Sequence, residues 1–161
     1  MELVPGAVTM RTHSLVQSTP LLAEVLAHTP VRIDLSLLLA ATPLDAPVEF
    51  TWDGRSLKRL VTCWEDDFAW QSGTALPPAE AMLDKAGLKV FDFHPVHIAL
   101  NSVTADGYTQ LKEHTVELPQ VGRELMDRFT QKGNGTRTAF LAVIDRASAE
   151  GRARLVREVV S

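Results

Sequence analysis

The sequence predicts an α/β fold of parallel strands with helices at the C-terminal end. Residues that favour β-structure alternate with polar ones at 6–12 and 31–35, and the segment 18–29 between them has the spacing of an amphipathic helix. Apolar runs at 57–64 and 88–94 indicate two further strands. Because parallel neighbours need a crossover connection, this alternation predicts a parallel sheet.

The first helix has recognisable start and stop signals. Ser18 or Thr19 can cap its N-terminus, and Pro20 suits the first turn. Leucines and valines recur on one face of the segment, as in a helix that packs on a sheet. We expect the helix to end before Pro30, because the residue before a proline disfavours helical backbone.

Residues 40–59 depart from this alternation. The segment contains Pro43 and Pro47, and a β-like stretch at 48–52 leads into Asp53-Gly54. Asp-Gly is typical of a two-residue hairpin turn. We therefore expect a loop and a hairpin that form an excursion from the parallel sheet.

The C-terminal half indicates helices. Proline at 77–78 and glycine at 87 bracket a short helix, and helical spacing follows at 105–114, 118–131 and 136–160. These last segments predict terminal helices that cover a sheet or a partner.

Length and composition exclude several classes of protein. At 161 residues the chain has the size of one domain, and its 16 basic and 20 acidic residues give a net charge of −4 without a basic stripe, so nucleic acid is not an expected partner. The single cysteine, Cys63, excludes an internal disulfide and a multi-cysteine zinc site. No secretory leader and no membrane-spanning run is recognisable, so a cytoplasmic protein without a membrane partner is expected.

Polar side chains cluster where the predicted strands end. The densest stretch is 88–98, in which Asp92, His94 and His97 follow an apolar run and Pro95 marks the end of the strand. Similar pairs of residues two apart are Arg11 with His13, Arg32 with Asp34, and Trp64 with Asp66. Sites in parallel α/β folds gather at the carboxyl ends of the strands, so we expect these side chains to share one site.

Each of these residues also has a purely structural explanation. His13 suits a hydrogen-bonded structural histidine, and Asp34 with Arg32 suits an internal ion pair. The triplet Glu65-Asp66-Asp67 is also typical of a solvated turn at a helix start. Trp52 and Trp70 are explained by packing, and Cys63 by a buried apolar position.

Four short motifs in this order resemble the polysaccharide deacetylase-like proteins. They are Arg-Thr-His-Ser-Leu-Val-Gln-Ser-Thr at 11–19, Arg-Ile-Asp-Leu-Ser-Leu at 32–37, Trp-Glu-Asp-Asp at 64–67 and Phe-Asp-Phe-His-Pro-Val-His-Ile at 91–98. The resemblance spans about residues 6–101 and implies a partial or distorted (β/α) barrel. It also implies hydrolysis of N- or O-acetyl groups on a sugar or polysaccharide, with one divalent metal held by an aspartate and two histidines four positions apart.

The sequence departs from this pattern in two places. His13 matches the first histidine of the ligand pair, but Gln17 stands at the second position. The strand that carries an early Asp-Asp pair in the family would precede residue 1. We therefore expect one deacetylase-like domain over residues 1–161 that is incomplete at its N-terminus, and a homo-oligomer or a partner chain that completes the barrel.

The resemblance assigns roles to the strand-end residues. His13, Asp66, His94 and His97 are the candidate ligands of a divalent metal, with zinc as the expected ion because imidazoles and a carboxylate suit it. The candidate catalytic residues are Asp67 or Asp92 as base, and His94 or His97 as the acid that protonates the leaving group. Arg11 and Trp64 are candidates for binding a carbohydrate or another acetylated small molecule. The alternative function is a non-catalytic carbohydrate-binding or assembly subunit on the same scaffold.

Overall fold

A computed structural model of the protein describes residues 6–74, 76–114 and 117–160. The backbone forms two compact units. The first contains the chain up to Cys63, together with Lys85–Val90 and the residues from Arg154 onward. The second contains Trp64–Asp84 and Phe91–Ala153. Each unit is described in turn.

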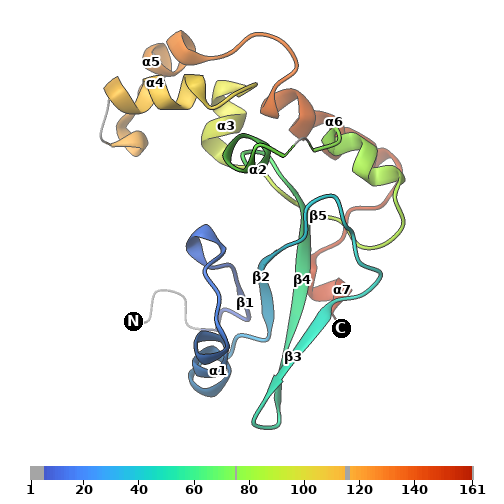
Figure 1. The fold of residues 1–161 in the computed structure, drawn as a ribbon. Coiled ribbons are helices and arrows are strands. Elements are labelled where there is room, and N and C mark those ends of the chain that lie inside the picture. Colours follow the sequence, from blue (N-terminus) through green and yellow to red (C-terminus); the bar gives the residue numbers. More distant parts are fainter. Residues whose placement is uncertain (1–5, 75, 115–116, 161) are drawn as a thin grey trace. The chain divides into compact units, whose positions relative to one another are not determined.

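The first unit begins with the predicted strand–helix–strand order. Strand β1 (Thr9–Met10) lies parallel to β2 (Ile33–Leu38), with Thr9 opposite Ile33 (Figure 1). Between them α1 (Thr19–His28) has Pro20 in its first turn, and the Ser18 hydroxyl accepts a hydrogen bond from the Leu21 N–H. The cap and the proline therefore act as the sequence predicts.

Strand β2 lies further along the chain than the alternation suggested. It covers Ile33–Leu38 because the apolar residues continue to Leu38. Arg32 therefore precedes the strand, and Asp34 lies near its start rather than at its carboxyl end. The prediction that Arg32 and Asp34 mark a carboxyl strand end is wrong.

The Asp53-Gly54 hairpin is confirmed. Strand β3 (Val48–Trp52) pairs antiparallel with β4 (Arg55–Glu65), and Trp52 lies opposite Arg55. Asp53 and Gly54 both have positive φ, at 47° and 71°, as a type I′ turn requires. On its other edge β4 lies parallel to β2, which gives the order β1-β2-β4-β3, with β5 (Val90–Asp92) also paired to β4.

One hydrophobic cluster holds the first unit together. Its members come from α1, from the sheet and from the segment between α1 and β2, and they are Leu22, Leu26, Val31 and Leu57, with Met10, Val25 and Phe50 packed against them. Parallel strands with a helical crossover and a C-terminal helix, α7 (Val156–Val159), match the predicted α/β partial barrel.

The second unit is mostly helical. After the end of β4 come α2 (Phe68–Ser72) and the 3-10 helix η2 (Ala79–Asp84), and after β5 comes α3 (Pro95–Leu100). They are followed by α4 (Asp106–His114), the 3-10 helix η3 (Leu118–Gln120), α5 (Arg123–Phe129) and α6 (Thr136–Ala149).

Two of the predicted helices differ from the structure in detail. The helix expected between 77 and 87 is the shorter 3-10 helix η2, whose Ala79 and Met82 are buried at the i, i+3 spacing that stacks side chains in 3-10 geometry. The segment 118–131 divides into η3 and α5, with Gly122 as the residue before α5. None of the helices in the described ranges is long and apolar enough to cross a membrane.

A row of aromatic rings forms part of the interior of the second unit. Phe93 follows β5, and its ring centroid lies 5.0 Å from that of Trp64 and 5.3 Å from that of Phe140 in α6. The Trp64 indole N–H donates to the Pro77 carbonyl at 3.0 Å. The ends of β4 and β5 and helix α6 are thus packed together. This packing holds the polar residues that follow both strands in defined positions.

Candidate metal and acid–base site

Three consecutive acids end strand β4 in the second unit. Glu65 is the last residue of the strand, and Asp66 and Asp67 form the turn that leads into α2. Glu65 and Asp66 are buried, and Asp67 is half-buried. Three carboxylates with this little exposure need partners, because a buried charge without a partner is costly.

His94 supplies the partner of Asp66. It follows β5 and is the residue before α3, whose first residue is Pro95. One oxygen of Asp66 accepts a hydrogen bond from His94 Nδ1 at 2.6 Å, and the other accepts from the His94 backbone N–H at 2.9 Å. The Asp66 N–H donates to the Asp92 carbonyl at 3.2 Å. The ends of β4 and β5 are therefore joined through Asp66.

This arrangement favours a proton on His94. The hydrogen bond to Asp66 is the largest cause that raises the pKa of His94 to about 9, and the charges of Asp66, Asp67 and Asp92 act in the same direction. Burial of the ring opposes them by a smaller amount. In the metal-free protein, His94 is accordingly an imidazolium at neutral pH.

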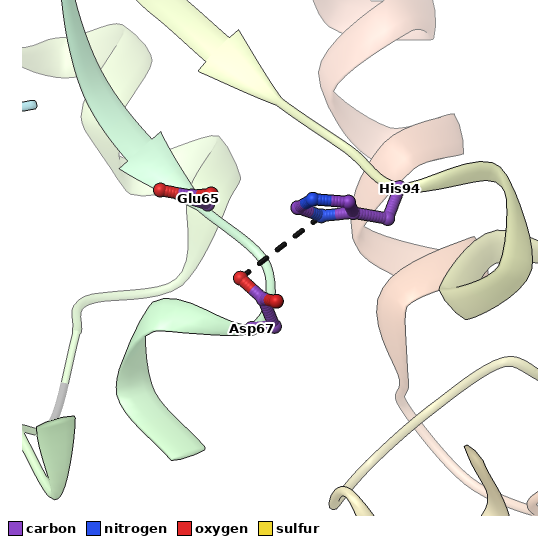
Figure 2. A group of neighbouring side chains, drawn as sticks. All are labelled: Glu65, Asp67 and His94. Atoms are coloured by element: carbon purple, nitrogen blue, oxygen red, sulfur yellow. Dashed lines mark ion pairs between the residues drawn. The ribbon is translucent and has the colours of Figure 1, made fainter. Parts of the chain in front are cut away.

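Glu65, Asp67 and His94 form a possible metal-binding group. One ligand atom from each of the three lies within 4.8 Å of the others. Figure 2 shows Glu65 at the end of β4, Asp67 in the turn after it, and His94 facing them from the end of β5. His94 Nδ1 lies 4.0 Å from an Asp67 oxygen, and the other Asp67 oxygen accepts from the Gln71 amide at 2.6 Å.

The chemistry of these donors fits a divalent metal ion. Two carboxylates and one imidazole are a ligand set that zinc and similar ions accept. Since Asp66 occupies Nδ1 of His94, the nitrogen that remains for a ligand is Nε2. A carboxylate bound to the second nitrogen is the usual support of a metal-binding histidine, because it fixes the orientation of the ring.

His97 lies next to His94 but in a different environment. It is in α3 and only 4% exposed, and its Nδ1 is 3.1 Å from the Ser102 hydroxyl. Three rings meet it edge-on: His94 at 5.7 Å, Trp70 at 4.9 Å and Tyr108 at 5.1 Å between centroids. Burial is the largest cause that lowers the pKa of His97, and the charge of His94 lowers it further, whereas the charges of Asp66 and Asp67 act in the opposite direction.

The other predicted residues of the second unit lie close by. Asp92 is the last residue of β5, half-buried, and its charge contributes to the raised pKa of His94. Trp64 is 8% exposed and packs against Phe93, so its part in substrate binding stays a prediction.

Arg11 and His13 belong to the first unit. His13 begins the 3-10 helix η1 (His13–Leu15), and both side chains are exposed. Their roles as metal ligand and substrate-binding residue stay predictions. The donor group around His94 comes from the second unit alone.

Gln17, at the position of the family's second histidine, has its own partners in the first unit. Its side-chain oxygen accepts from the Arg59 guanidinium, and its amide nitrogen donates to the Ser36 carbonyl at 3.4 Å. Arg59 also donates to the fully buried Asp34 at 2.8 Å, which corrects the ion pair expected between Asp34 and Arg32. Gln17 is therefore tied to a guanidinium, which disfavours a metal ion at its oxygen.

Sequence reasoning gave no role to Glu65, which lies in the possible metal-binding group. The triplet was recognised, but roles were assigned to Asp66 and Asp67 only. Residues two apart on an extended segment share a face, so the same alternation that paired Asp92 with His94 could have paired Glu65 with Asp67. Ser102 and Tyr108 were missed because nothing in the sequence links them to His97.

The parallel strands joined by a helical crossover define an α/β partial barrel. His94 and several acidic side chains lie at the carboxyl ends of β4 and β5, where folds of this class carry their sites. A family model described as WbmS-like polysaccharide deacetylase matches residues 1–112. This chain belongs to that family. The match includes both strand ends that carry the site.

One solved structure resembles the chain over most of its length. It is a protein from Bordetella bronchiseptica, described as a proposed polysaccharide deacetylase involved in O-antigen biosynthesis. The two are 28% identical with a TM-score of 0.72, and the alignment covers 90% of this chain. The chain spans 58% of the length of that relative. A comparison with curated proteins found no match.

Proposed function

We propose that this protein removes acetyl groups from an N- or O-acetylated sugar or polysaccharide by metal-dependent hydrolysis. The proposal is carried by one observation at the ends of strands β4 and β5. His94, which is hydrogen-bonded to Asp66, lies close to the carboxylates of Glu65 and Asp67. Membership of the polysaccharide deacetylase family supports the substrate class. The role described for the Bordetella relative supports it as well.

The residues of the second unit divide into three tasks. Glu65, Asp67 and His94 would hold the metal, because their donor atoms lie together. Asp66 bonds Nδ1 of His94 and so leaves Nε2 as the ring nitrogen for a ligand. A bound divalent metal would polarise the acetyl carbonyl and lower the pKa of a water molecule.

Asp92 is our candidate for proton transfer. It ends β5, two residues before His94, and is not among the three metal donors. We assign it as the base that takes a proton from the attacking water. The same carboxyl group then returns this proton to the leaving amine or alkoxide, so that the proton balance closes within one residue.

Zinc binding and acetate release test the proposal together. Calorimetry with zinc, cobalt and nickel should detect a single site in the wild type. Binding should weaken at least about tenfold in Glu65→Gln and His94→Ala, because each loses a ligand. Asp92→Asn should retain the metal but release acetate from chitin oligosaccharides or O-acetylated sugars at least about 100-fold more slowly.

His28→Ala is the matched control. His28 is an exposed histidine of α1 whose ion pair is with Glu24, so its loss should change neither metal binding nor acetate release. A wild-type protein that binds none of the three metals would rule out the metal-dependent mechanism.

The second candidate function is a non-catalytic carbohydrate-binding or assembly subunit. The tie between Gln17 and Arg59 favours it, because this position does not offer the second histidine of the family pattern. Saturable binding of acetylated oligosaccharide without any acetate release, in the presence of each metal, would establish this function instead.

A further inference from the structure

The most enclosed titratable residue beside the proposed site is His97, and the metal-binding group does not include it. Its exposure and its neighbouring groups both differ from those of His94. His94 is a third exposed and faces carboxylates, whereas His97 is 4% exposed and enclosed by rings.

The surroundings of His97 explain why the position holds an imidazole. Packing against Trp70 and Tyr108 alone would be served equally well by an apolar side chain, without the cost of burying nitrogen atoms. The Ser102 hydroxyl, 1% exposed, bonds to Nδ1 and fixes the rotation of the ring about its side-chain axis. An imidazole bonded on one side and packed on the other has one preferred orientation.

Ser102 is itself held firmly. Its N–H donates to the His97 carbonyl at 3.0 Å, and its own carbonyl accepts from the Thr136 N–H at 2.9 Å and from the Thr136 hydroxyl at 3.1 Å. The hydroxyl that orients His97 is therefore anchored to the end of α3 and the start of α6. This orientation does not depend on a mobile side chain.

The oriented ring of His97 packs against the ring of His94. The two rings meet at 76°, with centroids 5.7 Å apart. The first turn of α3 also joins the two residues, since the His97 N–H donates to the His94 carbonyl at 2.9 Å. Asp66 controls one edge of the His94 ring and His97 limits its rotation on another side.

We propose that His97 is a positioning residue which, through its Nδ1 bond to Ser102, holds the His94 ring in the orientation that Asp66 requires. This inference rests on the proposed function for its consequence, because the orientation of His94 decides where Nε2 points. It assigns His97 neither a bond to the metal nor a proton transfer.

Substitution of His97 by asparagine or by glutamine distinguishes the role of Nδ1 from that of Nε2. The amide of asparagine lies where Nδ1 lies, and that of glutamine lies near Nε2. His97→Asn should therefore keep the bond to Ser102, whereas His97→Gln and Ser102→Ala should lose it. If His97 acts through Nδ1, the last two variants should resemble each other and differ from His97→Asn.

The first readout needs no metal. The His94 Nδ1 proton in its short, charge-assisted bond to Asp66 should give a low-field proton resonance in the wild type. That resonance should persist in His97→Asn and be shifted or lost in His97→Gln and Ser102→Ala. Because this measurement is made in chelator, it tests the inference even if the protein proves to bind no metal.

The second readout is zinc affinity. We expect a loss within about threefold for His97→Asn and of about tenfold for His97→Gln and Ser102→Ala, the size typical of removing a support behind a metal-binding histidine. The cobalt absorption spectrum should keep its wild-type band positions in all three variants, because no ligand is exchanged.

Three results would overturn the inference. One is a folded His97→Asn variant that binds no zinc or has an altered cobalt spectrum, which would make His97 a ligand. Another is a low-field His94 resonance unchanged in both His97→Gln and Ser102→Ala. If the His97 variants do not fold, the Ser102→Ala variant tests the inference by itself. A wild-type His94 resonance and a wild-type zinc affinity in this variant would refute the positioning role of His97.

Discussion

Replacing Asp66 by asparagine should remove the largest interaction that raises the pKa of His94. Asparagine has the same shape but only one acceptor oxygen, so it cannot accept from both the backbone N–H and Nδ1 of His94. We expect the pKa of His94 to fall from about 9 toward its ordinary value of 6.5. Histidine resonances followed by NMR titration in chelator would measure this directly.

The rise in pKa of His94 from 6.5 to about 9 sets an upper bound on what protonated His94 contributes to the free energy of unfolding. A tenfold change in proton affinity is about 1.4 kcal/mol, so the bound is about 3 kcal/mol. Since 33% of the His94 side chain is exposed, solvent screening reduces the expected contribution to about 1–2 kcal/mol.

The sign of the pH dependence follows from the raised pKa. A group whose pKa is higher in the folded protein stabilises it fully below the unfolded value of 6.5 and loses this contribution as the pH rises through about 9. In chelator, the free energy of unfolding of the wild type should therefore fall by about 1–2 kcal/mol relative to Asp66→Asn between pH 6.5 and pH 9.5. Urea unfolding across this range is the assay, and parallel curves for the two proteins, or a wild-type His94 that titrates near 6.5, would refute the reasoning.

Three further predictions concern the metal and the packing of each unit. Zinc affinity should fall about tenfold for each pH unit below 9, since the metal competes with one proton for His94. Gly135→Ala should destabilise the protein by about 1–3 kcal/mol, measured by urea unfolding, because a Cβ there would lie 2.1 Å from the backbone oxygen of Asn101. Arg59→Met should cost about 3–5 kcal/mol in the same assay, because it leaves the fully buried Asp34 without its cation.

Each of these predictions has a control and a contrary outcome. Gly122→Ala adds a Cβ with nothing within 4 Å, so a loss equal to that of Gly135→Ala would show that the contact with Asn101 is not the cause. Arg32→Ala removes an arginine that donates to the backbone carbonyls of Thr29 and Val31, and should cost far less than Arg59→Met. A zinc affinity that does not change between pH 6 and pH 8 would exclude competition at His94.

Local signals in the sequence determined much of the framework. Ser18 and Pro20 start α1, and Asp53-Gly54 makes the hairpin, because a cap or a turn depends on neighbours within a few residues. The apolar runs located β4 and β5, and the polar residues after them marked the place of the candidate site. The α/β fold with parallel strands followed from the order of strands and helices, and the partial barrel followed from the resemblance to polysaccharide deacetylase-like proteins.

The partners of the polar residues were decided by the tertiary structure. Asp34 pairs with Arg59, which is 25 positions away, rather than with the adjacent Arg32. Of the three acids at the end of β4, the middle one accepts hydrogen bonds from the backbone N–H and the ring of His94, and the outer two lie with His94 in the group that could hold a metal ion.

His94, which precedes α3, and His97, which lies within it, show the same division. Their spacing in the sequence gave both the same prospective role, because composition and periodicity are alike for a ring that faces carboxylates and one that faces aromatic rings. Burial, set by Trp70 and Tyr108 from other helices, distinguishes them. A sequence can determine which residues lie after a strand, whereas which groups reach each nitrogen depends on how distant segments pack.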